Sequence, residues 1–245
     1  MQQGQFTIEE NRNIARDVWF MRLKGDHAFA APGQFAQISL PGFFLRRPIS
    51  ACDFWPGGFS VIYKVVGNGT ERMAAMTAGQ TLDMLTGLGN GFDLAACQRP
   101  LLIGGGTGTP PIYGLAKRLA ESGRIPKIVL GFGSDEDVFL AQEFKELGCE
   151  ISVATMAPGR HRQGLVTEFL PPESYDYFYA CGPLPMLQAV CGTCPTSGQL
   201  SLEARIGCGF GVCMGCSFPT IHGSKRICAE GPVLQKEEIV WPTSR

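Results

Sequence analysis

Charge is scarce in this chain, and what there is nearly cancels. Charged residues make up 18% of the 245 positions, and 21 basic against 22 acidic side chains leave a formal charge of −1. Without a basic field, nothing concentrates the protein on nucleic acid or on an anionic membrane, which excludes a DNA-binding protein of the electrostatic kind. The 44% of hydrophobic residues exclude intrinsic disorder, because they supply enough apolar surface for a core.

Long apolar runs are absent as well. No stretch reaches the ~18 apolar residues of a membrane span. Residues 1–13 have neither the basic nor the apolar region of a signal peptide. We therefore expect a cytoplasmic protein, and in that compartment the 10 cysteines indicate metal binding rather than a disulfide framework.

Glycine is abundant instead, with 32 residues that follow no repeat, so we expect it in tight loops near ligands. Over residues 1–97, strand-sized runs are separated by Gly, Pro, Asn or Asp turns, which predicts an antiparallel β-barrel. One short helix is expected there, at 70–76. The expected strands are 6–9, 18–23, 34–40, 49–54, 59–66 and 81–85.

Apolar strands and amphipathic helices alternate between residues 98 and 200. This alternation predicts a parallel, doubly wound α/β sheet of the nucleotide-binding kind. The expected strands are 101–103, 127–131, 150–155 and 175–180, and the expected helices are 110–122, 138–147, 165–170 and 183–190. A compact cysteine-rich module follows, so the predicted domains are 1–97, 98–200 and 201–245.

The cysteine module has the spacing C-x4-C-x2-C, with a fourth cysteine after eleven more residues. These cysteines are Cys208, Cys213, Cys216 and Cys228. This is the plant-type pattern of four thiolates that hold a [2Fe–2S] cluster, and the glycines between them let backbone N–H groups turn toward sulfur. A zinc site is the alternative, because Cys191 and Cys194 form a C-x2-C pair eighteen residues before that of Cys213 and Cys216. It leaves Cys208 and Cys228 without a role.

Two motifs in the barrel region suit phosphate groups. Arg47 precedes Pro48 where a strand begins, and an arginine can clamp a pyrophosphate while Ser50 can bond to a flavin or phosphate oxygen. Strict alternation places Arg47 and Ser50 on opposite faces, so they meet one ligand only if the segment is irregular or the ligand wraps it. Gly69 and Thr70 open a helix whose amides suit a second phosphate contact.

A glycine-rich turn at residues 104–109 follows the first strand of the α/β region. The next helix begins with Pro110 and Pro111, which leaves the preceding amides free for an anion. Cys181 and Gly182 end the last strand of this region, at the edge where open α/β sheets bind ligands. Taken alone, Cys181 is also typical of a buried core thiol.

Together these motifs resemble the family of electron-transfer subunits of two-subunit, NAD-linked dihydroorotate dehydrogenases (dihydroorotate dehydrogenase B), in the ferredoxin reductase superfamily. The resemblance covers essentially the whole chain. It implies an oxidoreductase subunit of pyrimidine (UMP) biosynthesis that passes electrons between NAD+ and an FMN-containing catalytic subunit, through FAD and a [2Fe–2S] cluster. The expected assembly is a heterotetramer of two plus two. The alternative is a diaphorase-like FAD/[2Fe–2S] subunit of another redox complex, of the hydrogenase or transhydrogenase type.

The resemblance also implies the site residues, and no residue is expected to act as a catalytic acid or base. Those for FAD are Arg47, Pro48, Ile49, Ser50, Ile62, Tyr63, Lys64, Gly69 and Thr70. Those for the nicotinamide nucleotide are Gly105, Gly106, Thr107, Gly108, Cys181 and Gly182. The implied cluster ligands are Cys208, Cys213, Cys216 and Cys228. The loop 207–218, with the apolar Phe210, Val212 and Met214, is the expected docking face for the catalytic subunit.

One segment departs from the family pattern. After the strand expected at 150–155, the family carries acidic residues and a glycine, whereas this chain has Arg160 and Arg162. In the superfamily this region meets the adenosine ribose, where acidic residues reject a 2′-phosphate and arginines accept one. We expect NADH as the substrate, with NADPH a better competitor than usual if these arginines reach the ribose. A solvated loop is the alternative.

Overall fold

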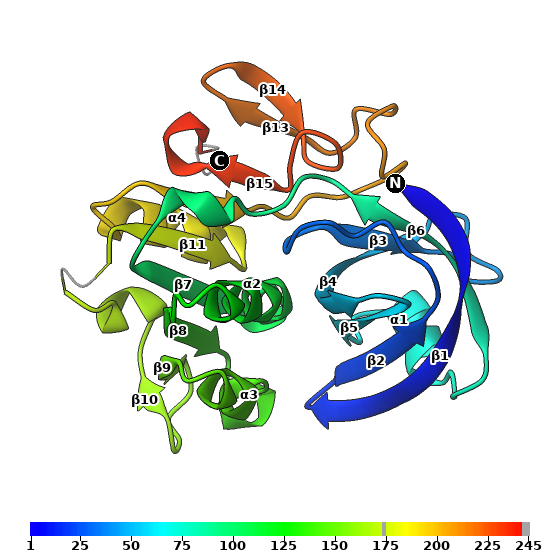
Figure 1. The fold of residues 1–245 in the computed structure, drawn as a ribbon, viewed down its shortest axis with the longest axis horizontal. Coiled ribbons are helices and arrows are strands. Elements are labelled where there is room, and N and C mark those ends of the chain that lie inside the picture. The colour runs from blue at the N-terminus through cyan, green and yellow to red at the C-terminus, as the bar shows by residue number, and fades with distance from the viewer. Residues whose placement is uncertain (173–174, 242–245) are drawn as a thin grey trace.

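The fold has two bodies side by side, a barrel and a sheet flanked by helices, in a computed structural model that describes residues 1–172 and 175–241 (Figure 1). The barrel is closed in the order β1-β2-β5-β4-β3-β6, and every pairing in it is antiparallel. The predicted barrel is therefore confirmed. Its elements are β1 (Gln2–Ala15), β2 (Val18–Lys24), β3 (Phe35–Ile38), β4 (Arg47–Trp55), β5 (Gly58–Lys64), α1 (Asn68–Ala74) and β6 (Thr81–Leu88).

The second body is a seven-stranded sheet in the order β10-β9-β8-β7-β11-β12-β15. Every pairing is parallel except that of the last two strands, so the predicted parallel α/β region is confirmed. Its elements are β7 (Pro100–Gly105), α2 (Thr109–Glu121), β8 (Lys127–Phe132), α3 (Ala141–Glu146), β9 (Glu150–Thr155), β10 (Arg162–Gln163), β11 (Tyr177–Cys181), α4 (Leu184–Thr193), β12 (Gly198–Ser201) and β15 (Val233–Gln235).

Three elements differ most in length or type from the sequence prediction. β1 is much longer than expected, because Asn11 and Asn13, residues typical of turns, lie inside the strand. Its pairing with β2 has two irregularities. Helix α3 begins at Ala141 and not at 138, since Leu140 has a φ of 61°, outside the right-handed helical region. The predicted helix 165–170 is one 3-10 turn, Val166–Phe169. In the part of the chain with assigned structure, no helix is both long and apolar enough to cross a membrane.

The cysteine-rich segment contains strands that the sequence analysis did not predict. β13 (Ser217–Thr220) and β14 (Gly223–Arg226) form a hairpin, and β15 pairs with β12 at the edge of the large sheet. Asn90, just after the barrel, donates to the carbonyl of Val233 at 2.7 Å and accepts from its N–H at 2.9 Å. The segment therefore packs on the barrel and on the sheet, above both in Figure 1.

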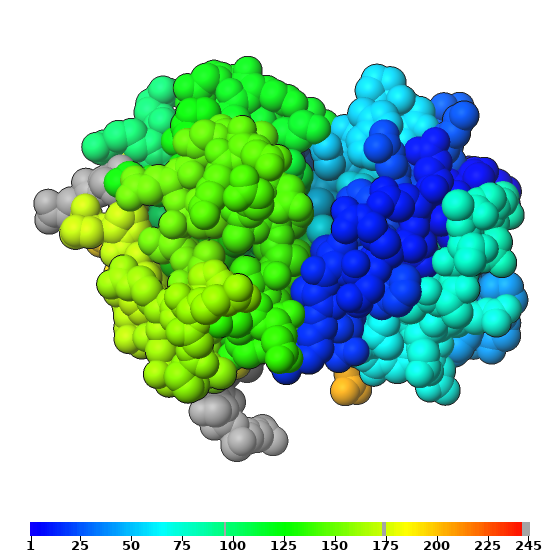
Figure 2. All heavy atoms as spheres, turned by 90° about the horizontal axis from the view of Figure 1, so that it is seen from below, coloured from blue at the N-terminus to red at the C-terminus, as the bar shows by residue number. Residues whose placement is uncertain are grey.

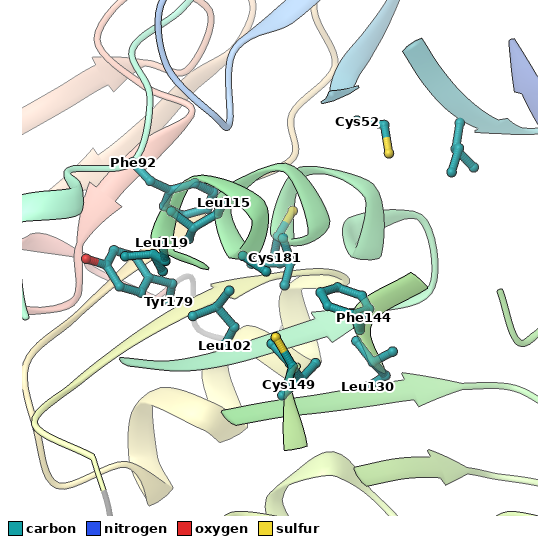
Figure 3. Packing of buried hydrophobic residues seen from close by; sticks show 14 of the residues in the cluster. Cys52, Phe92, Leu102, Leu115, Leu119, Leu130, Phe144, Cys149, Tyr179 and Cys181 are labelled. Carbon is teal, nitrogen blue, oxygen red and sulfur yellow. The ribbon is translucent and has the colours of Figure 1, made fainter. Parts of the chain in front are cut away.

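Helix α2 joins the two bodies through a shared apolar core. Leu115 and Leu119 on α2 pack with Leu102 and Tyr179 of the sheet, and Cys52 of the barrel belongs to the same buried cluster (Figure 3). A Cβ at Gly114 would collide with the backbone oxygen of Cys52, so only glycine lets α2 approach the barrel this closely.

Ion pairs also hold the two bodies together. Figure 2 shows them from below, with the blue barrel against the green sheet region. Arg16, in the turn between β1 and β2, donates to Asp137 at 2.7 Å and to Glu136 at 3.0 Å. Lys64, at the end of β5, lies 3.8 Å from the same Asp137. The end of β5 is therefore held against the loop that follows β8.

Candidate functional site

A cavity of about 380 Å³ lies between the barrel and the sheet, and we call it the central cavity. It brings together nine of the predicted site residues: Pro48, Ile49, Ser50, Ile62, Tyr63, Lys64, Thr70, Thr107 and Cys181. Nine lining residues were not predicted: Phe35, Val66, Ser201, Leu202, Glu203, Ala204, Ile206, Ile227 and Pro232. The predicted residues for FAD and for the nucleotide thus meet at one place.

The hydroxyls of Tyr63 and Thr70, both in the central cavity, have hydrogen-bond partners within the chain. The Tyr63 hydroxyl donates to Asn11 at 2.9 Å. The Thr70 hydroxyl donates to the Gly67 carbonyl at 3.0 Å and accepts from the Val66 N–H at 2.9 Å. Thr70 therefore shapes the loop before α1, whereas the Ser50 hydroxyl makes no hydrogen bond to any residue within 1–172 or 175–241.

Arg47 lies outside the central cavity, beside Gly69. Its guanidinium lies over the Phe43 ring, 4.3 Å from the centroid, and donates to the Leu45 carbonyl. A Cβ at Gly69 would come within 2.8 Å of the Arg47 guanidinium carbon. Ser50 faces the cavity on the other side of β4, so a ligand that meets both Arg47 and Ser50 must wrap the strand.

A second cavity of about 400 Å³ lies at the carboxyl edge of the sheet, and we call it the edge cavity. Of the predicted residues, it contains Gly105 and Gly106. Gly108 and Gly182 pack closely beside these residues. A Cβ at Gly108 would lie 2.6 Å from the Gly182 nitrogen, and a Cβ at Gly182 would lie 3.1 Å from the Gly105 Cα. The remaining lining is Gly131, Phe132, Gly133, Met156, Gly164, Leu165, Val166, Thr167, Pro183, Pro185, Met186 and Ala189.

The glycine-rich turn after β7 borders both cavities. Gly106 lines the edge cavity, and its neighbour Thr107 lines the central cavity. Cys181 also lines the central cavity, where burial raises the pKa of its thiol to about 12. The thiol is therefore neutral at physiological pH, and it forms part of the wall of the central cavity.

The arginines that depart from the family pattern do not line the edge cavity. The Arg160 side chain is 86% exposed, with its Nε 3.7 Å from Asp135, and Arg162 stacks over the Phe169 ring at 4.5 Å. Asp135 accepts the Arg160 N–H at 2.6 Å and lies 2.6 Å from the His161 ring. These bonds lower the pKa of Asp135 to about 2. Sequence reasoning missed this acidic group, although its place just after β8 was a signal for it.

The four predicted cluster cysteines lie close together, in two pairs. Cys208 lies within hydrogen-bonding reach of Cys213, and Cys228 within reach of Cys216. Burial opposes ionisation of Cys208, but the backbone N–H groups of Cys213, Phe210 and Val212 outweigh it and lower the pKa of its thiol to about 6. Burial and the neighbouring Cys216 raise the pKa of Cys228 to about 12.

Backbone N–H groups point at three of these sulfur atoms. Gly211 donates to Cys228 at 3.2 Å, Val212 donates to Cys208 at 3.3 Å, and the N–H of Cys228 donates to Cys216 at 3.4 Å. Gly211 has a φ of +86°, a conformation that favours glycine. This donor set suits an anionic sulfur-ligated group.

Cys208 and Cys228, which the zinc alternative leaves without a role, each lie beside another cysteine of the motif. Cys191 and Cys194 lie at the end of α4, in the same apolar cluster as Cys216 and Cys228, and burial raises the pKa of both thiols. Two thiol pairs suit a two-iron cluster, in which each iron takes two terminal thiolates.

Comparisons with known proteins give the same assignment. Residues 203–240 match the iron–sulfur cluster binding domain of dihydroorotate dehydrogenase B, and residues 102–192 match the oxidoreductase NAD-binding domain. A structure of an NADH-dependent reduced ferredoxin-NADP oxidoreductase matches with a TM-score of 0.86 and 28% identity, over 96% of this chain and 90% of that one. Fold and site therefore define an NAD-linked oxidoreductase of the ferredoxin reductase type, with an iron–sulfur domain at its C-terminal end.

Two curated relatives fix the family. The electron transfer subunits of dihydroorotate dehydrogenase B (NAD(+)) from Geobacillus sp. (strain WCH70) and Listeria monocytogenes are each 39% identical to this chain, over 98% of its length and 99% of theirs. The chain belongs to this family of electron transfer subunits, as the sequence motifs predicted.

Proposed function

We propose that this chain passes electrons between NAD(H) and an FMN-containing dihydroorotate dehydrogenase subunit, in pyrimidine biosynthesis. The observation that carries the proposal is that residues adjacent in sequence link the edge cavity, the central cavity and the cysteine loop. The Gly106–Thr107 turn borders both the edge and the central cavity. Ile227, the neighbour of Cys228, lines the central cavity from the other side. This arrangement supports a nucleotide site, a flavin site and a cluster site in series.

FAD fits the central cavity and the groups beside it. When bound, it supplies the exchange of a hydride with nicotinamide and of single electrons with an iron–sulfur cluster. The segment Pro48–Ser50 would hold the ring system with Tyr63 and Thr107, and Ser50 brings a hydroxyl that is free to bond. Arg47, packed on Gly69, would hold the pyrophosphate where the ligand passes the start of β4.

The proposed cluster ligands are Cys208, Cys213, Cys216 and Cys228, and the proposed cluster is [2Fe–2S]. The paired thiols and the inward N–H groups support this assignment. In the edge cavity, the glycines Gly105 and Gly106 would let the nucleotide backbone approach closely, next to Thr107. No residue of this relay needs to act as an acid or a base.

The proposed docking face for the catalytic subunit is the loop 207–218. Phe210, Val212 and Met214 are 48%, 74% and 53% exposed, an apolar group beside the cluster cysteines. A heterotetramer of two plus two is the proposed assembly, in the cytoplasm, where free thiols such as the ten of this chain persist. The identity of 39% to the dihydroorotate dehydrogenase subunits, against 28% to the bifurcating reductase, favours this partner over another redox complex.

Arg47→Ala should weaken the retention of FAD. Removal of a charge-assisted hydrogen bond costs about 1.5–3 kcal/mol, so the dissociation constant should rise about 10- to 150-fold. Fluorescence of FAD released during gel filtration measures the loss, and Arg99→Ala, remote from the cavity, serves as control. The absorbance of the cluster should not change. Equal FAD retention in both variants would show that Arg47 does not hold the cofactor.

NADH should reduce the flavin of the isolated chain faster than NADPH. Because Arg160 is exposed and Arg162 stacks on Phe169, neither reaches the edge cavity, and Arg160→Ala should change the ratio of the two rates by less than about threefold. Stopped-flow absorbance with each nucleotide measures this ratio. A larger change would place Arg160 at the ribose, and no reduction by either nucleotide would contradict the proposed function.

A further inference from the structure

Gln37, in the middle of β3, carries a buried amide without a partner. Its exposed fraction is 0%, and neither Nε2 nor Oε1 forms a hydrogen bond with any residue that the structure describes. Burial of an unpaired amide is unfavourable, and buried side-chain amides in proteins are nearly always bonded to protein, to water or to a bound group. The unpaired amide of Gln37 therefore indicates that a bound group forms a hydrogen bond with it.

The alternation of β3 turns Gln37 away from the barrel core. Ala36 and Ile38 pack inside the barrel, whereas Phe35 lines the central cavity and belongs to the apolar cluster of Cys216 and Cys228. Gln37 shares the outer face with Phe35. The barrel strand thus presents one residue to the flavin site and the next outer residue toward the cysteine segment.

The neighbours of Gln37 across the sheet lie at the same boundary. In the strand register, Gln37 pairs with Pro48, which lines the central cavity, and with Leu85 on the other side. Leu85 and Cys208 pack against the same apolar cluster. The amide is therefore placed between the flavin site and the first of the cluster cysteines.

Gly209 brings the cysteine loop into direct contact with this amide. A Cβ at Gly209 would lie 2.9 Å from Gln37 Cδ and would overlap Nε2, and Gly209 has a φ of +85°. The amide of Gln37 thus occupies the space that a side chain at position 209 would need. Gly209 follows Cys208 directly, which places the amide N–H groups beside the sulfur ligands.

We propose that Gln37 Nε2 donates a hydrogen bond to a sulfur atom of the iron–sulfur cluster on its Cys208 side. The proposal rests on the cluster assignment above. An N–H···S hydrogen bond stabilises the reduced cluster, which carries one more negative charge, and so raises its reduction potential. The Gly211 and Val212 donors are backbone groups of the cysteine loop itself, whereas Gln37 is a side chain of the barrel and tunes the cluster from the flavin side.

Redox titration of the isolated holoprotein, followed by electron paramagnetic resonance, tests the proposal. Gln37→Met and Gln37→Leu remove the donor and keep an apolar side chain, so the cluster potential should shift to more negative values in both. Gln199→Met is the matched control, because Gln199 is buried but accepts from Asp93 N–H at 2.9 Å in another part of the chain. The control should keep the potential of the unmodified protein.

An unshifted potential in both Gln37 variants, with clusters fully loaded, would overturn the proposal. If neither variant keeps its cluster, pulsed resonance of the unmodified protein with ¹⁵N-labelled glutamine side chains decides instead. A coupling of the reduced cluster to an amide ¹⁵N supports the hydrogen bond, and its absence contradicts it. Failure of the unmodified chain to hold iron and sulfide would instead contradict the proposed function.

Discussion

Replacement of Cys213 or Cys216 by serine should remove the cluster, where the unmodified chain should hold iron and acid-labile sulfide at about two each. Each substitution takes one of the two thiolates from an iron. The exposed Cys213 can be changed without disturbing the core, whereas Cys216 is buried, and its loss should also destabilise the C-terminal segment, because ligation contributes to its folding. Iron and sulfide analysis with the visible spectrum measures the result.

Cys191→Ser and Cys194→Ser provide the controls for this experiment. Both cysteines pack near the end of α4 and have no place in the paired arrangement of the cluster thiols. These variants should keep iron, sulfide and the visible spectrum. Stoichiometric zinc in protein produced with adequate iron would contradict the cluster assignment, and loss of iron in the control variants would reassign the ligands.

Val212→Glu should uncouple the two subunits while each keeps its own cofactors. Val212 is 74% exposed beside the cluster cysteines, and a charge buried without a partner in an interface costs about 2–5 kcal/mol. Association should therefore weaken at least about thirtyfold. The readout is NAD+-dependent dihydroorotate oxidation by the co-expressed pair, together with reduction of this chain's own flavin by NADH, which should be unchanged.

Ile125→Glu is the matched control for the docking face. Ile125 is 50% exposed, in the connection between α2 and β8, so the added charge stays in water. Val212 is a better target than Met214, whose φ of 58° would add backbone effects to the charge. Equal activity of the Val212 and Ile125 variants would place the docking face elsewhere.

The features that the sequence predicted well are those set by neighbours along the chain. The cysteine spacing depends on one loop, and the glycine turn at 104–109 depends on one strand and helix. The two bodies of the fold were also predictable. Strand-sized runs fill the chain up to about residue 97, and strands alternate with helices after it. Strand β1 was underestimated because Asn11 and Asn13, residues typical of turns, lie inside the strand.

The residues that the sequence did not reveal reach the site through long-range contacts. Phe35 and Gln37 look like ordinary strand residues, and only the packing of the cysteine segment on β3 gives them a role. Glu203 lines the central cavity with a pKa raised by burial, but it follows β12, a strand that the sequence analysis did not predict. Asp135 follows β8, whereas Arg160 follows β9, so their contact depends on the pairing of these two strands.

We expect the oxidation of dihydroorotate to take place on the catalytic subunit and not on this chain. Dihydroorotate oxidation needs a general base beside the substrate carbon and a flavin stacked on it. None of the three histidines lines the central or the edge cavity. His27 lies 2.9 Å from the Trp55 carbonyl, and His161 lies beside Asp135. Neither cavity therefore holds a histidine that could act as this base.

Co-expression with the candidate catalytic subunit, followed by an assay of NADH formation from dihydroorotate and NAD+, tests the central claim most directly. The account predicts that the two chains purify together and form NADH from dihydroorotate, whereas this chain alone forms none. Turnover of dihydroorotate by this chain alone, or two chains that do not associate, would contradict it.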